Sequence, residues 1–183
     1  AGKIYKLLKN YYLEKKRQNR FIPGKTKIRY SGGWFDGKEV TAMVRVALSG
    51  WLGSGPVAEK FEEVLSKYIG AYKALSTNSG SSATLLCMAA LTSRLRPDPL
   101  RPGDEVITPA CTFATTVSAI VRQNLVPKFV DVDIETLNPT PNMIAKAITR
   151  KTKALFIPHT LGNPNDMTKL MKLAKKNNLY VIE

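Results

Sequence analysis

From residue 105 onward, short apolar segments alternate with amphipathic segments, and this alternation constrains the fold more than any other feature of the sequence. The apolar segments have the length of strands and the amphipathic segments the length of helices. The expected strands cover residues 105–108, 127–132, 153–158 and 179–183, and the expected helices 114–123, 141–150 and 167–177. Repeated strand–helix units favour a mainly parallel sheet covered by helices. The sequence therefore predicts an α/β fold with three layers.

The residues before this repeat are predicted to be mostly helical. Apolar spacing indicates helices at 39–49, with Asp36 as a cap, and at 57–68, ended by Gly70. A glycine-rich loop, WLGSGP, separates these two helices. The segments that follow are a strand expected at 72–76 and a third helix expected from Ala83 toward Leu95.

Positive charge is concentrated at the two ends of the sequence. Residues 1–30 carry ten basic and one acidic residue, residues 31–145 ten and eleven, and residues 146–183 eight and two. We therefore divide the chain into a basic N-terminal helical arm, 1–30, and a globular region, 31–183. A nucleic-acid-binding domain should also spread basic residues over its core elements, so the neutral middle argues against a nucleic-acid partner.

The arm itself has an amphipathic pattern. Five apolar residues fall on one face of a helix: Ile4, Leu7, Leu8, Tyr11 and Tyr12. We expect this helix to dock by that face, with its lysines in solvent. Binding of an anionic partner, such as nucleic acid or an anionic membrane, is the alternative.

Other protein classes are excluded by what the sequence lacks. No apolar run approaches the roughly 18 residues of a membrane span, and the N-terminus lacks the apolar region of a signal peptide. We expect a soluble, cytoplasmic protein without a membrane partner. Cys87 and Cys111 are 24 positions apart and the sequence has one histidine, a pattern typical of neither a disulfide framework nor a metal site. Both cysteines are expected to be small buried residues.

Ligands of parallel α/β sheets bind beyond the carboxyl ends of the strands, which directs attention to three segments. Residues 78–83 (NSGSSA) open a helix with N–H groups and hydroxyls suited to an anion, although a plain serine-capped helix is the alternative. This segment matches neither the Walker A loop nor GxGxxG. Phe113 follows the first strand of the repeat and either stacks on a planar cofactor or belongs to the core. His159 follows the third strand and is either structural or part of a site.

Several segments together resemble a known family. They are FIPGKTKI, SGGWFD, WLGSGPVAEKFE, LSTNSGSSA, LRPGDEVITPACTFATTV, LVPKFVDVD and ALFIPHTLGNPNDM. In this order and spacing they resemble the N-terminal part of the DegT-type sugar aminotransferases, which are fold-type I enzymes that use pyridoxal 5′-phosphate (PLP). Within the family, FIPGK, SGxxFD and HTLGNP are similar to the nucleotide-sugar 3-dehydrases of the CDP-4-keto-6-deoxyglucose 3-dehydrase kind. WLGSGP and TFATT are closer to the aminotransferases.

The resemblance implies roles for three residues. Gly80 and Ser81 fall on the pair that binds the phosphate of PLP or of pyridoxamine 5′-phosphate (PMP), and Phe113 falls on the aromatic residue that stacks over the pyridine ring. It also implies a nucleotide-linked keto-sugar substrate and a homodimer whose partner subunit completes each site. No metal ligand is predicted within this sequence.

The resemblance also places essential residues beyond Glu183. An aspartate that pairs with the pyridine nitrogen follows the strand YVIE, and a lysine in the aminotransferases or a histidine in the 3-dehydrases lies further on. Cysteines that hold a [2Fe–2S] cluster in some of these dehydrases are also absent from the sequence. We therefore expect residues 31–183 to be an incomplete PLP-dependent transferase major domain, truncated before its catalytic residues.

The favoured function is that of a 4-keto-6-deoxyhexose 3-dehydrase in 3,6-dideoxyhexose (lipopolysaccharide) biosynthesis. A PLP-dependent sugar aminotransferase of the same family is the first alternative. An inactive fragment whose basic arm binds an anionic partner is the second.

Overall fold

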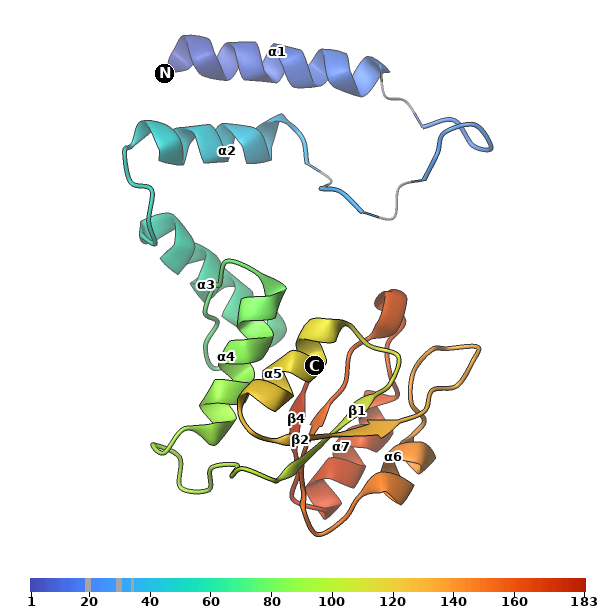
Figure 1. Cartoon of the computed structure of the whole chain (residues 1–183). Helices are drawn as coiled ribbons and strands as arrows, with labels where there is room; N and C mark the ends of the chain where they lie inside the picture. The colour runs from blue at the N-terminus through green and yellow to red at the C-terminus, as the bar shows by residue number, and fades with distance from the viewer. Residues whose placement is uncertain (19–20, 29–30, 34) are drawn as a thin grey trace. The chain divides into compact units, whose positions relative to one another are not determined.

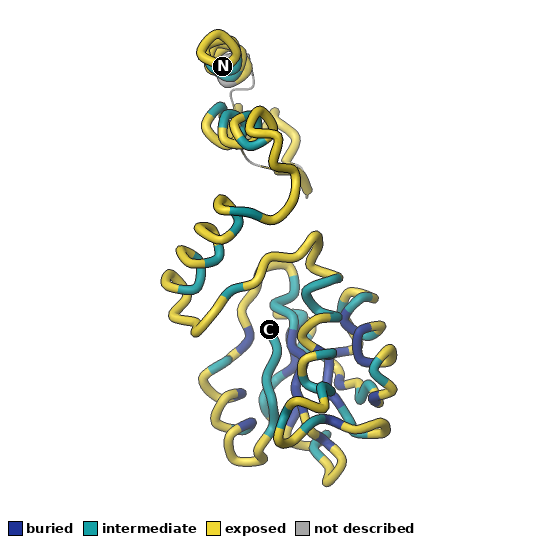
Figure 2. The backbone as a smooth tube through the Cα atoms, turned by 90° about the vertical axis from the view of Figure 1, so that its left-hand side faces the viewer, coloured by how far each residue is buried: buried dark blue, intermediate teal, exposed yellow. Residues whose placement is uncertain are grey.

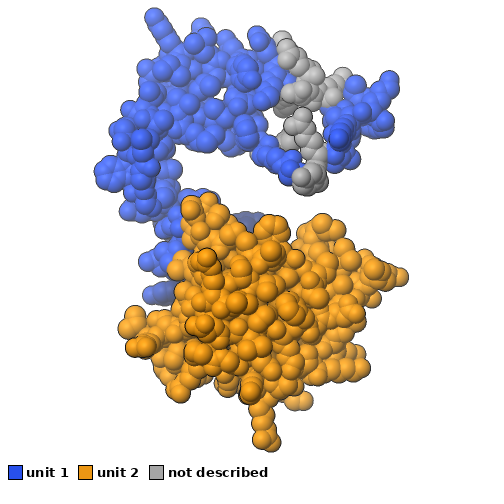
Figure 3. All heavy atoms as spheres, viewed as in Figure 1, with its two compact units in different colours: residues 1–76 blue, residues 77–183 orange. Residues whose placement is uncertain are grey.

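The structure, a computed structural model, describes residues 1–18, 21–28, 31–33 and 35–183. It consists of two compact units, residues 1–76 and residues 77–183 (Figure 3). Trp34 of the segment SGGWFD and residues 29–30 at the end of the expected basic arm lie outside the described residues. The domain boundary expected at residue 30 stays a prediction.

The second unit is built on a four-stranded sheet (Figure 1). Its strands are β1 (Glu105–Pro109), β2 (Val126–Val130), β3 (Thr152–Phe156) and β4 (Tyr180–Ile182). They are ordered β2-β1-β3-β4, and all three neighbouring pairs are parallel. The predicted parallel sheet is confirmed, with every strand within two residues of its expected position.

Helices cover both faces of this sheet. They are α4 (Gly80–Thr92), α5 (Ala114–Arg122), α6 (Pro141–Ala147) and α7 (Met167–Lys176), with a short 3-10 helix, η1 (Thr160–Gly162). Helix α6 is shorter than predicted because the backbone at Ile148 is already extended and the Thr149 N–H bonds to the Thr152 hydroxyl. The repeat of strands and helices is otherwise as the sequence predicts.

Two hydrophobic cores lie on opposite sides of the sheet. Successive strand residues point to opposite faces, so Val106 and Ala154 face one core while Ile107 and Leu155 face the other. The first core is completed by Met88 of α4 and by Ala119 and Ile120 of α5. The second contains Ile144 of α6 and Leu170 and Ala174 of α7. The predicted three-layer architecture is confirmed, and Figure 2 shows the buried residues gathered in this unit.

The order of the strands reverses direction at β1. From β1 the chain moves to β2 on one side, and it then crosses back to β3 and β4 on the other. Helix α5 therefore packs with α4 on one face, whereas α6 and α7 lie on the other. In open parallel sheets such a reversal leaves a crevice outside the carboxyl ends of the two strands concerned. In this sheet that position lies between the segments that follow β1 and β3.

The first unit contains three helices: α1 (Gly2–Gln18), α2 (Gly37–Leu48) and α3 (Pro56–Ile69). Asp36 caps α2 in a capping box with Glu39. Gly70 ends α3 in the left-handed conformation, with φ of 68°. Both ends were predicted from the sequence. Neither α2 nor α3 has a buried residue in the described structure.

Helix α1 forms as predicted but docks by a face rotated from the expected one. Leu8 and Tyr12 are half-buried, whereas Ile4, Leu7 and Tyr11 are exposed. Tyr12 lies against Gly37, and the Arg45 guanidinium lies 5.9 Å from the Tyr5 ring. Tyr5 therefore faces α2 in place of Leu7. The absence of a side chain at Gly37 leaves space for the Tyr12 ring, and the Arg45 guanidinium makes a cation–π contact with the Tyr5 ring.

The strand predicted at residues 72–76 is wrong. This segment pairs with none of the four strands, and Tyr72 and Leu75 are exposed. Its last residue is held instead by α3, because the Ser76 N–H and hydroxyl donate to the Glu62 carboxylate at 2.7 and 2.6 Å. An apolar alternation gives a strand only where a partner strand is available.

The expected burial of the two cysteines is also wrong. Cys87 and Cys111 are free and exposed, because Cys87 lies on the outer side of α4 and Cys111 in the loop after β1. Among the described residues, no group of three or more histidine, cysteine or carboxylate side chains could hold a metal ion. No helix in the described part of the chain is long and apolar enough to cross a membrane.

One polar cluster joins three strands at the amino end of the sheet, opposite the carboxyl edge. Glu105 at the start of β1 accepts hydrogen bonds from the Thr149 and Thr152 hydroxyls and from Lys128 Nζ, the last at 3.2 Å. Its side chain is 17% exposed. The hydrogen bond from Thr149, followed by those from Lys128 and Thr152, lowers the pKa of Glu105 despite its partial burial.

We expect Glu105→Gln to lower the free energy of unfolding by about 1 kcal/mol at pH 7. A carboxylate whose pKa is lower in the folded state stabilises the fold above its unfolded pKa, and this contribution is lost as the pH falls through the folded pKa. The difference in the free energy of unfolding between wild type and Glu105→Gln should therefore disappear in acid. Urea unfolding of the full chain between pH 7 and pH 3 measures it, with exposed Glu135→Gln as control. A difference that persists at pH 3 would contradict the role of the ionised carboxylate.

Candidate functional site at the carboxyl edge of the sheet

The first element of the site is the N-terminus of α4. Ser79 is the N-cap, and its hydroxyl oxygen accepts a hydrogen bond from the Ser82 N–H at 3.1 Å. Gly80 and Ser81 occupy the first two helical positions, where the N–H groups have no acceptor within the helix. The helix starts at Gly80, three residues before the predicted Ala83, so this pair lies in the first turn.

The space around this helix start is open. No atom lies within 4 Å of the position that a Cβ on Gly80 would occupy, and Ser81 is exposed. A helix N-terminus with free N–H groups and adjacent hydroxyls favours a phosphate group. The residues present therefore fit the phosphate of PLP or PMP. The assignment of Gly80 and Ser81 to that phosphate stays a prediction.

The second element is Phe113, which follows β1 and precedes α5. The residue is 72% exposed and belongs to neither hydrophobic core. The alternative that Phe113 is a core residue is therefore wrong, and its ring is available to a planar ligand. Helices α4 and α5 pack against each other, and in Figure 1 they begin at the same side of the second unit, where the chain also ends.

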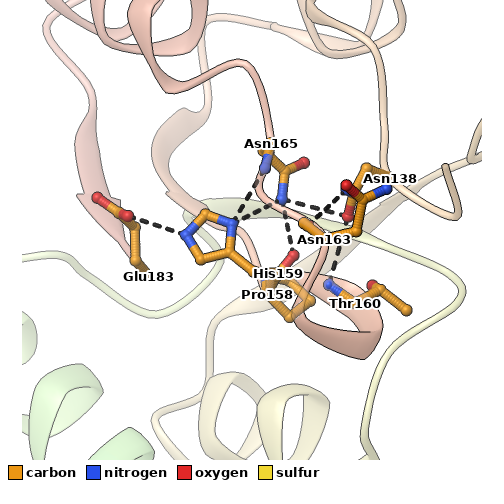
Figure 4. Close-up of polar contacts among 7 residues, drawn as sticks. All are labelled: Asn138, Pro158, His159, Thr160, Asn163, Asn165 and Glu183. Carbon is orange, nitrogen blue, oxygen red and sulfur yellow. Dashed lines mark hydrogen bonds and ion pairs between the residues drawn. The ribbon is translucent and has the colours of Figure 1, made fainter.

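The third element is a chain of polar side chains around His159 (Figure 4). His159 Nε2 lies 3.0 Å from Glu183 Oε2, which joins the segments after β3 and β4. His159 Nδ1 lies 3.2 Å from the backbone nitrogen of Asn165 and 3.1 Å from its side-chain nitrogen. Both ring nitrogens are thus occupied by protein groups.

Two buried asparagines extend this chain to the loop after β2. Asn165 Nδ2 donates to the Pro158 carbonyl at 2.8 Å and lies 3.3 Å from Asn138 Oδ1. Asn138 in turn donates to the Asn163 carbonyl at 2.8 Å. Asn138 and Asn165 are 5% and 6% exposed. Buried amides with several partners cross-link the segments they contact, so the loops after β2 and β3 are held as one body.

Two threonine hydroxyls are buried in the segments that follow β1 and β3. The hydroxyl oxygens of Thr112 and Thr160 are buried and have no hydrogen-bond partner among the described residues. Asn165 Oδ1 is likewise buried without a partner among these residues. A buried polar atom without a partner is costly, so these three oxygens are points where the loops pack at the expense of hydrogen bonding.

Sequence reasoning identified Gly80, Ser81, Phe113 and His159 as candidates but missed the two asparagines and Glu183. Asn138 and Asn165 each adjoin a proline, in NPT and NPN, which by itself indicates a turn. Nothing in that pattern indicates that their side chains are buried or that they meet across 27 residues of sequence. The contact depends on how the loops of adjacent strands come together.

Comparison with known proteins agrees with this architecture. Residues 35–183 match the DegT/DnrJ/EryC1/StrS aminotransferase family. The chain belongs to this family. The match begins in the first unit and includes the whole sheet and every candidate residue described above.

Relatives that match nearly the whole chain include a lipopolysaccharide biosynthesis protein and a sugar dehydratase. The chain is 42% identical over 181 residues to the lipopolysaccharide biosynthesis protein RfbH of Salmonella typhimurium, covering 98% of this chain and 41% of the relative. It is 41% identical over 182 residues to the dTDP-4-dehydro-2,6-dideoxy-D-glucose 3-dehydratase of Saccharopolyspora spinosa, covering 99% of this chain and 39% of the relative.

A solved structure extends the similarity to three dimensions. The Escherichia coli GDP-4-keto-6-deoxy-D-mannose-3-dehydratase with bound hydrated PLP has a TM-score of 0.78 and 32% identity, covering 85% of this chain and 40% of that one. The chain thus spans about two fifths of the length of the proteins it matches.

We expect Asn138→Ala to lower the free energy of unfolding by about 2 kcal/mol, because it removes the donor to the Asn163 carbonyl and one of the two carbonyl acceptors of the buried Asn165 amide. Urea unfolding of the full chain measures the change. Asn142→Ala, at an exposed position of α6, is the matched control. Equal midpoints for the two variants would contradict the cross-linking role of Asn138.

Proposed function

We propose that this chain forms the cofactor-binding part of a PLP- or PMP-dependent enzyme that removes the 3-hydroxyl of a nucleotide-linked 4-keto-6-deoxyhexose. The observation that carries the proposal is the 41% identity to a sugar 3-dehydratase over 99% of the chain. The open helix start at Gly80 and the exposed Phe113 at the same edge of the sheet support it.

The chain's own residues have a defined part in this proposal. The N–H groups of Gly80 and Ser81 and the Ser81 hydroxyl hold the phosphate, and Phe113 covers one face of the ring. When bound, the cofactor supplies an electron sink for the reaction at the sugar. These residues bind and orient; within this chain we assign no residue to proton transfer.

Dehydration is favoured over transamination because of the relatives that match nearly the whole chain. The S. spinosa enzyme is a 3-dehydratase and aligns over all but one residue, and RfbH is a lipopolysaccharide biosynthesis protein. We therefore propose that the reaction belongs to deoxysugar synthesis for lipopolysaccharide. A cytoplasmic location is part of the same proposal. The family also contains aminotransferases, and transamination is the competing outcome of the test.

The test uses the full-length protein loaded with PMP or PLP, a nucleotide-linked 4-keto-6-deoxyhexose, and either glutamate or an added two-electron reductant. An electron source is included because exchange of the C3 hydroxyl for hydrogen consumes two electrons. Mass spectrometry and NMR of the sugar distinguish the two reactions. Loss of the C3 hydroxyl supports the dehydratase. Replacement of the C4 keto oxygen by an amine, with glutamate as donor, would identify an aminotransferase, and an unchanged sugar with both cofactors would overturn the proposal.

Some of these dehydratases carry a [2Fe–2S] cluster, and such a cluster does not fit the residues of this chain. Cys87 and Cys111 are its two cysteines, and the described residues contain no group of metal ligands. An iron–sulfur cluster of this kind takes four ligands. We propose that any cluster in this enzyme is held by residues outside the chain.

We further propose that the enzyme is a homodimer whose partner subunit covers the apolar surface of the first unit. The WLGSGP loop and α3 line a hollow of about 680 Å³ with Trp51, Val57 and Phe61. These side chains are 59%, 64% and 56% exposed. Exposed apolar clusters of this kind are typical of interfaces. Light scattering of the full-length protein checks the proposal, and a fully active monomer would contradict it.

We expect Ser81→Ala to weaken retention of the cofactor about tenfold, because one donor to the phosphate is lost. Equilibrium dialysis of PMP against the full-length variant, followed by its absorbance, measures the dissociation constant. Ser118→Ala, at an exposed position of α5, is the control. Unchanged affinity in Ser81→Ala would remove Ser81 from the site.

A further inference from the structure

His159 is the one histidine of the sequence, and its ring lies where β3 leaves the sheet. The side chain is 32% exposed, so the ring is neither free in solvent nor sealed in the core. The hydrogen bonds around the ring decide which of its nitrogens carries a proton.

The backbone of Asn165 decides the state of Nδ1. A backbone N–H can only donate, and the Asn165 N–H points at His159 Nδ1 over 3.2 Å. Nδ1 must therefore be the acceptor and carries no proton. The neutral ring then has its proton on Nε2, which donates to Glu183 Oε2 at 3.0 Å.

The Asn165 side chain supports the same assignment. Its nitrogen faces three acceptors: Asn138 Oδ1, the Pro158 carbonyl and His159 Nδ1. The reversed amide would point its oxygen at all three, so the orientation is fixed by its surroundings. The two hydrogens of this amide serve the Pro158 carbonyl and Asn138 Oδ1, and the backbone N–H is the donor to Nδ1.

We propose that His159 is a positioning residue, held as the neutral Nε2–H imidazole, that orients the Glu183 carboxylate and so sets the direction in which the chain leaves β4. Its donor side is used by Glu183 and its acceptor side by Asn165, so the ring does not serve as the base of the reaction. The consequence for catalysis rests on the proposed function, since β4 leaves the sheet at the edge where the cofactor is proposed to bind. The protonation state does not depend on it.

The first test is the tautomer itself. In the full-length protein labelled with ¹⁵N-histidine, ring ¹⁵N–¹H correlation spectra identify the protonated nitrogen, and the signal lost in His159→Gln assigns the ring. We expect a proton on Nε2 and none on Nδ1 at pH 7.5. Asn165→Ala keeps the backbone N–H that donates to Nδ1 and should leave the proton on Nε2, as should Thr168→Ala, exposed on α7. A proton on Nδ1 in the wild type would overturn the proposal.

The second test separates positioning from simple structural support. His159→Ala should lower kcat about tenfold and change KM less than about twofold, because a displaced site loses rate more than binding. His159→Gln keeps a side-chain N–H donor that can reach Glu183 and should recover most of the rate. Equal losses in the two variants, or an unchanged kcat in His159→Ala, would overturn the positioning role.

The two tests fail independently. If the wild type converts no nucleotide-linked keto-sugar, the proposed function is wrong, and the tautomer measured in the labelled protein still decides the assignment of His159. If the wild type is active and the ring carries its proton on Nδ1, the inference on His159 is wrong and the proposed function stands.

Discussion

Strand β1 is flanked by a strand on each edge and covered by helices on each face, and the rest of the second unit depends on this double burial. Val106 and Ile107 point to opposite sides of the sheet and are both fully buried. A strand in this position needs apolar residues at consecutive positions and helices on both sides. The chain meets both requirements by winding one way from β1 to β2 and the other way to β3 and β4.

The same reversal creates the candidate site. Because the crossover helices leave β1 and β3 on opposite faces, the segments that follow these strands diverge, and open parallel sheets bind their ligands at such a point. Phe113 and Thr112 follow β1, and His159 and Thr160 follow β3. Buried amides at Asn138 and Asn165 then hold the loops in place. The polar cluster at Glu105 performs the corresponding task at the opposite edge of the sheet.

Functional and structural roles can be separated by exposure and partners. Phe113, Gly80 and Ser81 are exposed, and the start of α4 faces open space. His159, Asn165 and Asn138 have their polar atoms largely engaged by protein groups. Groups of the first kind are free to meet a ligand, whereas groups of the second kind fix the shape of the loops that meet it. This division assigns the histidine to positioning, a choice that the sequence left open.

The sequence by itself determined the strand–helix repeat and the parallel sheet, because local periodicity records them directly. It also placed a helix after the glycine-serine segment, although the helix begins three residues earlier than predicted. The tertiary structure alone decided the unpaired state of residues 72–76, the exposure of Cys87, the face by which α1 docks and the Asn138–Asn165 contact. Each of these depends on which residues, distant in sequence, come to lie beside one another. A strand requires a partner strand and a buried amide requires hydrogen-bond acceptors. Neither can be predicted from the residues adjacent in sequence.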